Sequence, residues 1–505
     1  MSHKPLFSNR SVRGFTVIFI FCLAFAIRLY DLTDLPLDFH PTRQLLSAIK
    51  ARAIYYQTQP DGISTDQLET GIRMAKFKAG VEPVVFERLV AFTYQLIGEQ
   101  LWVARVYSSL FWLIGGVFLF LLARDLISFD GALISTVYYL FFPYAIIASR
   151  SFQPDPLMVM LTLVFWWSFF FWMRSPSWGL SLLTGLVGGF AIFIKFSAAF
   201  FVIGGALGLA LSQYKFRDLL RNGQAWMMAV LGVTPAMAYL VYGIFFRGGL
   251  NQQFAGRFIP ALLLSPLNYL AWETKVSFAV GGLFIMLALL ALLSTEDRRY
   301  RSLLYGLWSS YLLYGLFFDY HVATHDYYHL PLLPIVGLSL APLGNWFLSR
   351  VAESTGGWAR GGVFVVLIFG LLTNVRSVAG LMKREDFRPQ AVMWAEISRE
   401  ISDARVIALM EDYGARMEYW GLKSLATWPT VGDLNYVNLR GGGTDFDGLF
   451  RRYSSQRDLF LVTNFEELMR QPELRRRLEL FSLHAKEDGY WLFDLNAPIG
   501  GGGVP

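Results

Sequence analysis

A series of long apolar runs fills the first three quarters of the chain and constrains its fold more than any other feature. Several runs reach the roughly 20 residues that a helix needs to cross about 30 Å of hydrocarbon. Backbone groups in lipid must be hydrogen-bonded within their own segment, so these runs have to be helices. The sequence therefore predicts a polytopic α-helical membrane protein with about eleven transmembrane helices.

We place the predicted helices near Phe15–Tyr30, Val103–Leu122, Ala132–Ala148, Leu157–Met173, Leu180–Ile194, Phe196–Leu211, Ala225–Phe246, Val276–Leu293, Leu303–Phe318, Pro331–Leu348 and Val363–Leu381. The first run follows a basic start, as in a signal peptide. It continues into Arg28 and Asp31 rather than into a small-residue cleavage site, which predicts an uncleaved first helix.

Basic residues in the short loops predict the orientation of the helices. Loops assigned to the inside carry Arg124, Arg174, Lys215, Arg217, Arg221, Arg298, Arg299, Arg301, Arg350 and Arg360. The short outer loops at Ser149–Pro156 and Asp319–Leu330 carry between them only Arg150. This bias predicts a multi-pass protein of the plasma (inner) membrane with a cytoplasmic N-terminus. It also accounts for the net charge of +6, so no nucleic-acid partner is expected.

The less apolar parts of the chain are a long first outer loop and a C-terminal tail. We assign residues 1–381 to the transmembrane domain, including the outer loop at 31–102, and residues 382–505 to a small extracytoplasmic, soluble α/β domain. In the loop, Pro41–Tyr56 is predicted to be an amphipathic interfacial helix, with Arg52 snorkelling from its apolar stripe. Predicted elements of the tail are strands at Arg405–Met410, Asp458–Thr463 and Tyr490–Leu495, and helices at Asp445–Tyr453 and Phe465–Leu480.

Four segments on the predicted outer face carry the polar residues that matter most. The first, residues 34–43, contains Asp38, a surface carboxylate that can deprotonate an acceptor hydroxyl. The alternative is that Asp38 caps the following helix. The second, residues 150–156, contains Asp155 before a proline, a pattern typical of a helix start. Capping can explain Asp155 but does not explain Arg150.

The third and fourth segments add cationic and aromatic side chains. Lys195 lies between two apolar runs, where a lysine is by default a functional candidate. The alternative is a lysine that snorkels to the surface. In the fourth segment His321, His325 and His329 follow one another at intervals of four residues. This spacing leaves three interpretations open: a divalent metal site, contact with a phosphate or sugar, and anchoring in the membrane interface.

Taken together, these segments resemble a known family. The chain resembles the GT-C-fold, lipid-linked glycosyltransferases of the protein O-mannosyltransferase and aminoarabinose-transferase type (glycosyltransferase family 39 and its bacterial relatives). The resemblance covers residues 15–381. It rests on the order of Asp38 in the first outer loop, Glu82-Pro83 before the second helix, Arg105 near its start, Arg150 with Pro154-Asp155, Lys195 after the fifth helix, and Tyr327-Tyr328-His329-Leu330-Pro331 before the tenth.

The resemblance implies functions for individual residues. Asp38 matches the catalytic base, with Asp34 as the alternative, because many relatives carry a second carboxylate where this chain has Phe39. Asp155 matches an acidic residue beside the active site. The implied substrate-binding residues are Arg150, Lys195, His325, Tyr328, Glu82 and His329.

The chain is therefore predicted to be an inverting hexosyl- or pentosyltransferase. It would move a sugar from a polyprenyl-phosphate donor to a hydroxyl of a glycan, lipid or protein acceptor at the outer face. The phosphate leaving group activates the sugar, so no nucleotide is needed, and a divalent metal is left open as a cofactor. The main alternative is a polytopic transporter or lipid flippase, which tends to place its polar site near the bilayer midplane. A non-catalytic scaffold is the third interpretation.

Overall fold

The computed structural model describes residues 6, 9–76, 78, 80, 82–246, 250, 258–295, 297–354, 357–443 and 445–499 of the 505-residue chain. Contacts divide the chain into two compact units. The first contains Met1–Thr33, Ala79–Val90 and Gln100–Glu385, and the second contains Asp34–Lys78, Ala91–Glu99 and Asp386–Pro505. Most of the first outer loop thus groups with the C-terminal tail, whereas the sequence-based boundary at residue 381 kept it with the helices.

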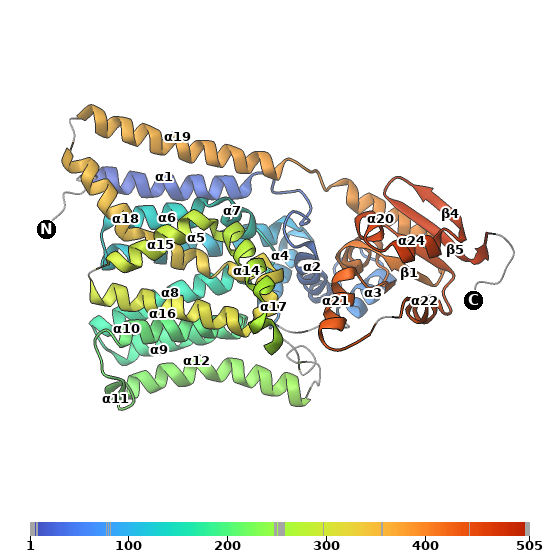
Figure 1. Ribbon diagram of the computed structural model, residues 1–505, viewed down its shortest axis with the longest axis horizontal. Helices are drawn as coiled ribbons and strands as arrows, with labels where there is room; N and C mark the ends of the chain where they lie inside the picture. The colour runs from blue at the N-terminus through green and yellow to red at the C-terminus, as the bar shows by residue number, and fades with distance from the viewer. Residues whose placement is uncertain are drawn as a thin grey trace. The chain divides into compact units, whose positions relative to one another are not determined.

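The first unit is helical (Figure 1). Its elements are α1 (Arg10–Leu29), the start of α4 (Val85–Ile97), α5 (Trp102–Leu126), α6 (Phe129–Phe141), α7 (Pro143–Ala148), α8 (Asp155–Arg174), α9 (Trp178–Ile194), α10 (Ala198–Ala210), α11 (Phe216–Leu219), α12 (Gly223–Val241), η1 (Tyr242–Phe246), η2 (Pro260–Leu264), α14 (Pro266–Val276), η3 (Ser277–Gly281), α15 (Gly282–Ser294), α16 (Arg298–Phe317), α17 (Asp319–Thr324), η4 (Asp326–His329), α18 (Leu332–Ser354) and α19 (Gly357–Met382).

Every apolar segment predicted from the sequence coincides with helical structure in this unit. Among the described residues, seven helical segments are long and apolar enough to cross a membrane, and three shorter apolar helices accompany them. The chain is therefore a multi-pass membrane protein. The number of about eleven spans stays a prediction.

Small residues let neighbouring helices of this unit approach closely. The helix α10 packs against α16, and a Cβ atom added to Gly306 of α16 would collide with the carbonyl oxygen of Gly204. A Cβ at Gly208, one turn further along α10, would lie 2.7 Å from the carbonyl oxygen of Ser302. Close backbone approach at such small-residue pairs is typical of helix association in lipid.

The second unit contains a five-stranded mixed sheet. Its strands are β1 (Val406–Leu409), β2 (Ala426–Thr427), β3 (Leu459–Val462), β4 (Phe481–Glu487) and β5 (Tyr490–Pro498), in the order β2-β1-β3-β5-β4. β1 is parallel to β2 and β3, while β5 is antiparallel to β3 and β4. The predicted strands coincide with β1, β3 and β5, and the sequence-based prediction missed β2 and β4.

The second unit also contains helices (Figure 1). They are α2 (Pro41–Tyr56), α3 (Thr65–Lys76), the end of α4, α20 (Pro389–Glu400), η5 (Glu411–Gly414), η6 (Met417–Gly421), α21 (Val431–Leu439), α22 (Phe446–Ser454), α23 (Phe465–Met469) and α24 (Pro472–Leu478). Alternate residues of β1 enter different cores: Val406 and Ala408 join the cluster around Trp394, and Ile407 joins the one around Trp428. Burial of both faces explains why β1 is apolar at every position.

The interfacial helix predicted at Pro41–Tyr56 has those bounds in the structure, but its arginine behaves differently from the prediction. Arg52 does not snorkel to a surface. Its Nε lies 2.7 Å from Oε1 of Glu99, and its guanidinium lies 3.5 Å from the ring centroid of Tyr419. The Tyr419 hydroxyl donates to the same Glu99 oxygen at 2.5 Å. An ion pair and a cation–π contact within the second unit therefore compensate the charge on the apolar stripe.

Candidate functional site

The first unit buries an ion pair where α8 begins and α9 ends. Asp155 is the first residue of α8, and Lys195 follows the last residue of α9. Lys195 donates from Nζ to Oδ1 of Asp155 at 2.7 Å, and the two side chains are only 9% and 1% exposed. Asp155 is thus engaged with a lysine, and no side-chain cap bond is found at the N-cap residue Pro154. Lys195 points to a buried partner, which does not fit the snorkelling alternative.

Aromatic rings from the η4 turn complete the surroundings of this lysine. The Lys195 ammonium lies 5.2 Å from the ring centroid of Tyr327 and 5.3 Å from that of Tyr328. Both distances allow cation–π attraction. In the same turn, Asp326 accepts a hydrogen bond from the Tyr144 hydroxyl of α7 at 3.0 Å. The second and fourth predicted segments therefore meet around Lys195, through Asp155 and Tyr328.

Three buried polar atoms, one of Asp155 itself and two of Gln153, which lies two residues before it, have no hydrogen-bond partner among the described residues. They are Oδ2 of Asp155 and both amide atoms of Gln153, whose side chain is fully buried. An unsatisfied buried polar group costs about 1–3 kcal/mol. Asp155 can accept one more bond here, and Gln153 can both donate and accept. This is a donor and acceptor set that sugar hydroxyls, which both donate and accept, would satisfy.

The sequence-based predictions assigned no function to Gln153, which lies in the second segment, and none to Asp326, Tyr144 or Tyr327 individually. The available signal was a glutamine directly before the Pro154-Asp155 pair. Glu82, by contrast, is half-buried in the segment before α4, and its contact with a substrate stays a prediction.

Arg150 contacts residues at the ends of α1 and α19. Its Nη2 donates to the carbonyl oxygen of Asp31 at 3.1 Å, and its Nη1 lies 2.8 Å from Sδ of Met382. Arg28 of α1 supports the same loop, since its Nε donates to Oγ of Ser149 at 2.7 Å. The two arginines thus fix the segment that leads to Gln153 and Asp155, and the contact of Arg150 with a donor stays a prediction.

His329, predicted to bind substrate, is a fully buried structural residue. Its Nε2 donates to the carbonyl oxygen of Val322 at 2.9 Å, and its Nδ1 accepts from the Tyr311 hydroxyl at 2.9 Å. Tyr311 in turn accepts from Nε1 of Trp272 at 2.9 Å. Both ring nitrogens are occupied, so the structure does not support substrate or metal contact by His329.

The histidine metal site is not supported either. His325 is half-buried, and its Nδ1 lies 2.7 Å from Oγ1 of Thr324. His321 and His325 lie with their rings stacked, 5.9 Å between centroids. Within the described ranges no group of three His, Cys, Asp or Glu side chains could hold a metal ion. Two interpretations of His325 therefore stay open: contact with a phosphate or sugar, and anchoring in the membrane interface.

The environment of His329 predicts a pH dependence of stability. Burial lowers the pKa of His329 to about 4, below the ordinary value of about 6.5. His329 therefore binds a proton more tightly in the unfolded chain than in the folded protein. Its contribution to the free energy of unfolding is complete above pH 6.5 and is lost as the pH falls towards 4. The loss amounts to about 3 kcal/mol. Unfolding temperatures of wild type and His329→Gln in detergent at pH 7.5 and pH 5 test this; equal pH sensitivity of the two proteins would contradict it.

Asp38, the predicted base, lies in the second unit, half-buried, two residues before the N-cap residue of α2, His40. Asp38 therefore does not occupy the capping position. The contacts around it include two hydrogen bonds: Nε2 of Gln44 donates to the carbonyl oxygen of Phe39 at 2.6 Å, and the Thr42 hydroxyl donates to Asp412 at 3.1 Å.

Asp34, the alternative base, is a structural residue. Its Oδ1 accepts from the backbone N–H groups of Leu35 at 2.9 Å and Phe387 at 3.0 Å, and it lies 3.7 Å from Nη1 of Arg388. Asp34 is buried and joins the first outer loop to the start of the tail within the second unit. The assignment of the base to Asp38, with Asp34 as the alternative, stays a prediction.

Comparisons with known proteins agree with this architecture. Residues 81–242 match the family described as dolichyl-phosphate-mannose-protein mannosyltransferase. No curated protein matches the sequence. The structure is similar to that of ArnT from Cupriavidus metallidurans in the apo state, with 17% identity, a TM-score of 0.56 and coverage of 96% of this chain and 98% of ArnT.

Two further solved structures are similar. For ArnT bound to undecaprenyl phosphate, the identity is 16%, the TM-score 0.53 and the coverage 94% of this chain and 97% of ArnT. For the oligosaccharyltransferase AglB from Archaeoglobus fulgidus, in complex with an inhibitory peptide and a dolichol-phosphate, the identity is 9%, the TM-score 0.52 and the coverage 96% and 75%. The resemblance to GT-C-fold, lipid-linked glycosyltransferases of the mannosyltransferase and ArnT type is confirmed.

Proposed function

We propose that this protein is a membrane glycosyltransferase that moves a sugar from a polyprenyl-phosphate donor to an acceptor hydroxyl at the outer face of the plasma membrane. The N-terminus would be cytoplasmic, and the C-terminal tail extracytoplasmic. The matched family and the similar structures, two of which hold a polyprenyl phosphate, support this class of donor. The acceptor would be a hydroxyl of a glycan, a lipid or a protein.

The reaction is a single displacement with inversion. The acceptor oxygen attacks the anomeric carbon while Asp38 takes the hydroxyl proton, and the bond from that carbon to the phosphate oxygen breaks. The electron pair leaves with the polyprenyl phosphate. General-base help of this kind typically accelerates a reaction about 10²–10⁴-fold.

The donor head group is assigned to the buried pair in the first unit. Lys195 carries three N–H donors, of which Asp155 Oδ1 uses one, so others can stabilise the charge that develops on the leaving phosphate. Asp155 Oδ2 and the Gln153 amide can bind sugar hydroxyls. The single observation that carries the proposal is this buried lysine–aspartate pair next to polar atoms without a protein partner.

Gln153→Leu tests that observation. Removing an amide without a protein partner should leave the unfolding temperature unchanged or raise it, because replacing such a group by an apolar one is not penalised. Binding of a polyprenyl-phosphate sugar should weaken about tenfold, the equivalent of roughly 1.4 kcal/mol. The measurement is donor titration of the purified full chain.

Gln224→Leu is the matched control. Its amide oxygen accepts from Nε1 of Trp172 at 2.7 Å, so this change should lower the unfolding temperature and leave donor affinity unchanged. If Gln153→Leu destabilised the protein and bound donor like wild type, Gln153 would be structural. If wild type bound no polyprenyl-phosphate sugar, the proposed function would be wrong.

A further inference from the structure

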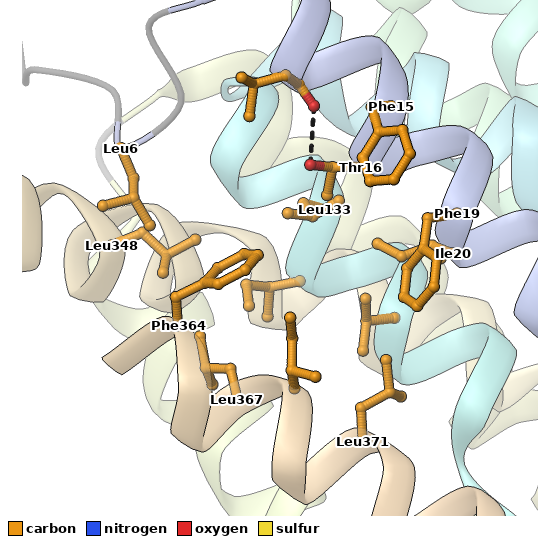
Figure 2. A pocket seen from close by; sticks show the side chains of 14 residues that line it. Leu6, Phe15, Thr16, Phe19, Ile20, Leu133, Leu348, Phe364, Leu367 and Leu371 are labelled. Carbon is orange, nitrogen blue, oxygen red and sulfur yellow. Dashed lines mark hydrogen bonds between the residues drawn. The ribbon is translucent and has the colours of Figure 1, made fainter. Parts of the chain in front are cut away.

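Two cavities follow one another between α1 and α19 in the first unit. The first has a volume of about 380 Å³ and an almost wholly apolar lining. Figure 2 shows Phe15 and Ile20 of α1 on one side of it, with Phe364, Leu367 and Leu371 of α19 on the other. The one polar side chain in this lining, Thr16, donates its hydroxyl to the carbonyl oxygen of Val12 at 2.8 Å. The side chains that line this cavity therefore suit an apolar molecule rather than a polar one.

The second cavity, of about 550 Å³, is lined by later residues of the same two helices and is partly polar. Tyr30 follows the last residue of α1, and α19 contributes Thr373, Arg376 and Ser377, with Lys383 just after its end. Arg376 and Ser377 follow Thr373 by three and four residues, so they lie on one face of the helix. The lining thus changes from apolar to cationic along a single pair of helices.

Arg376 makes this arrangement unusual. It is exposed on α19, inside a segment long and apolar enough to cross a membrane, and it has no ion-pair partner in the part of the chain that the structure describes. An arginine in such a position costs about 2.5–3.5 kcal/mol at the centre of a bilayer and less near the surface. Arg376 lies six residues, or about 9 Å, from the end of α19, so its long side chain can reach the membrane surface.

Lys383 adds a second cation at the same end. It lies 2.7 Å from Oδ1 of Asp31, but its side chain is 50% exposed and retains donors that face outward. An anion held between Arg376 and Lys383 would receive charge-assisted hydrogen bonds, which are stronger than neutral ones. A single phosphate group matches both the charge and the number of donors.

We propose that the groove between α1 and α19 binds one anionic glycerophospholipid, with its phosphate at Arg376 and Lys383 and an acyl chain in the apolar cavity. The distance along α19 from Phe364 to Arg376 is about 18 Å, close to half of the ~30 Å hydrocarbon thickness. The groove therefore fits a lipid of a single leaflet. This site is separate from the donor site of the proposed function.

The proposed lipid would fasten the end of α19 to the end of α1. Asp31, the partner of Lys383, also accepts from Arg150 through its carbonyl oxygen, and Met382 contacts Arg150 through its sulfur. Arg150 belongs to the loop that leads to Gln153 and Asp155. A lipid at this groove would thus stabilise the supports of that loop without contacting the Lys195–Asp155 pair.

Native mass spectrometry of the purified full chain, incubated with equimolar phosphatidylglycerol and phosphatidylcholine of identical acyl chains, tests the proposal. Wild type should retain one phosphatidylglycerol in preference to phosphatidylcholine. Arg376→Gln should weaken this retention at least tenfold. Leu371→Trp, which fills the apolar cavity and keeps both cations, should also weaken it. The control Arg384→Gln removes an exposed cation outside the cavity lining and should bind like wild type.

Three results would overturn the proposal. If wild type and Arg376→Gln retained phosphatidylglycerol equally, Arg376 would not bind the lipid phosphate, and the cationic end of the proposed site would be wrong. Displacement of phosphatidylglycerol by inorganic phosphate alone, with Leu371→Trp unaffected, would indicate a simple anion site. Preferential retention of polyprenyl phosphate would assign the groove to the donor. Size-exclusion profiles and unfolding temperatures of each variant show whether it is folded.

Discussion

Asp38→Asn is expected to lower the rate of sugar transfer by about 10²–10⁴-fold, because the amide cannot accept the proton of the acceptor hydroxyl. Asparagine keeps the size of the side chain and one of its two acceptor oxygens. The N-cap position of α2 belongs to His40, so the change should not remove a helix cap. The measurement is the turnover of purified protein at saturating polyprenyl-phosphate sugar, with the unfolding temperature recorded beside it.

Asp34→Asn is the matched control, four residues earlier. Asp34 accepts from two backbone N–H groups and lies near Arg388, so its replacement should destabilise the second unit while folded protein keeps turnover. Wild-type turnover in Asp38→Asn together with an inactive, folded Asp34→Asn would move the base to Asp34. Full activity of both variants would contradict the mechanism.

Lys195→Met is expected to have two separate effects. It leaves the 1% exposed carboxylate of Asp155 without its partner, and breaking a buried pair in this way costs about 3–5 kcal/mol of stability. It also removes the cation assigned to the donor phosphate. Loss of a charge-assisted partner costs about 1.5–3 kcal/mol, so donor affinity should fall roughly 10- to 100-fold.

The double variant Asp155→Asn with Lys195→Met separates these effects. It removes both charges, so most of the lost stability should return, while donor affinity should stay low. Lys195→Arg should be milder than Lys195→Met but not neutral, because a guanidinium fork does not reproduce a compact ammonium. Wild-type donor affinity in the double variant would show that the pair only stabilises the fold.

The pairing of Asp155 with Lys195 shows what the sequence can and cannot predict. Both residues were predicted as site candidates because charged residues next to apolar runs are rare. Both were also predicted to lie at the ends of helices. The sequence could not show that they meet across 40 positions of the chain, because the packing of α8 against α9 decides that contact. The same limit applies to Arg52, whose partners Glu99 and Tyr419 come from distant segments.

Other differences between the sequence-based interpretations and the structure have equally physical causes. The spacing of His321, His325 and His329 suggested a shared ligand set, but the chain buries His329 against Tyr311 and Val322. Strand β4 was missed because most of its positions are polar and half-exposed or exposed. The Asp488-Gly489 pair, where Gly489 has φ +100°, was a readable hairpin signal between β4 and β5.

The most direct test of the proposed function is an assay in liposomes that contain the purified protein and a polyprenyl-phosphate donor labelled in its sugar, with envelope acceptors supplied. We predict that label moves into acceptor with release of one free polyprenyl phosphate per sugar, and that Asp38→Asn abolishes both. If the labelled donor instead crossed between leaflets intact, with no acceptor labelled and no polyprenyl phosphate released, the protein would be a flippase rather than a glycosyltransferase.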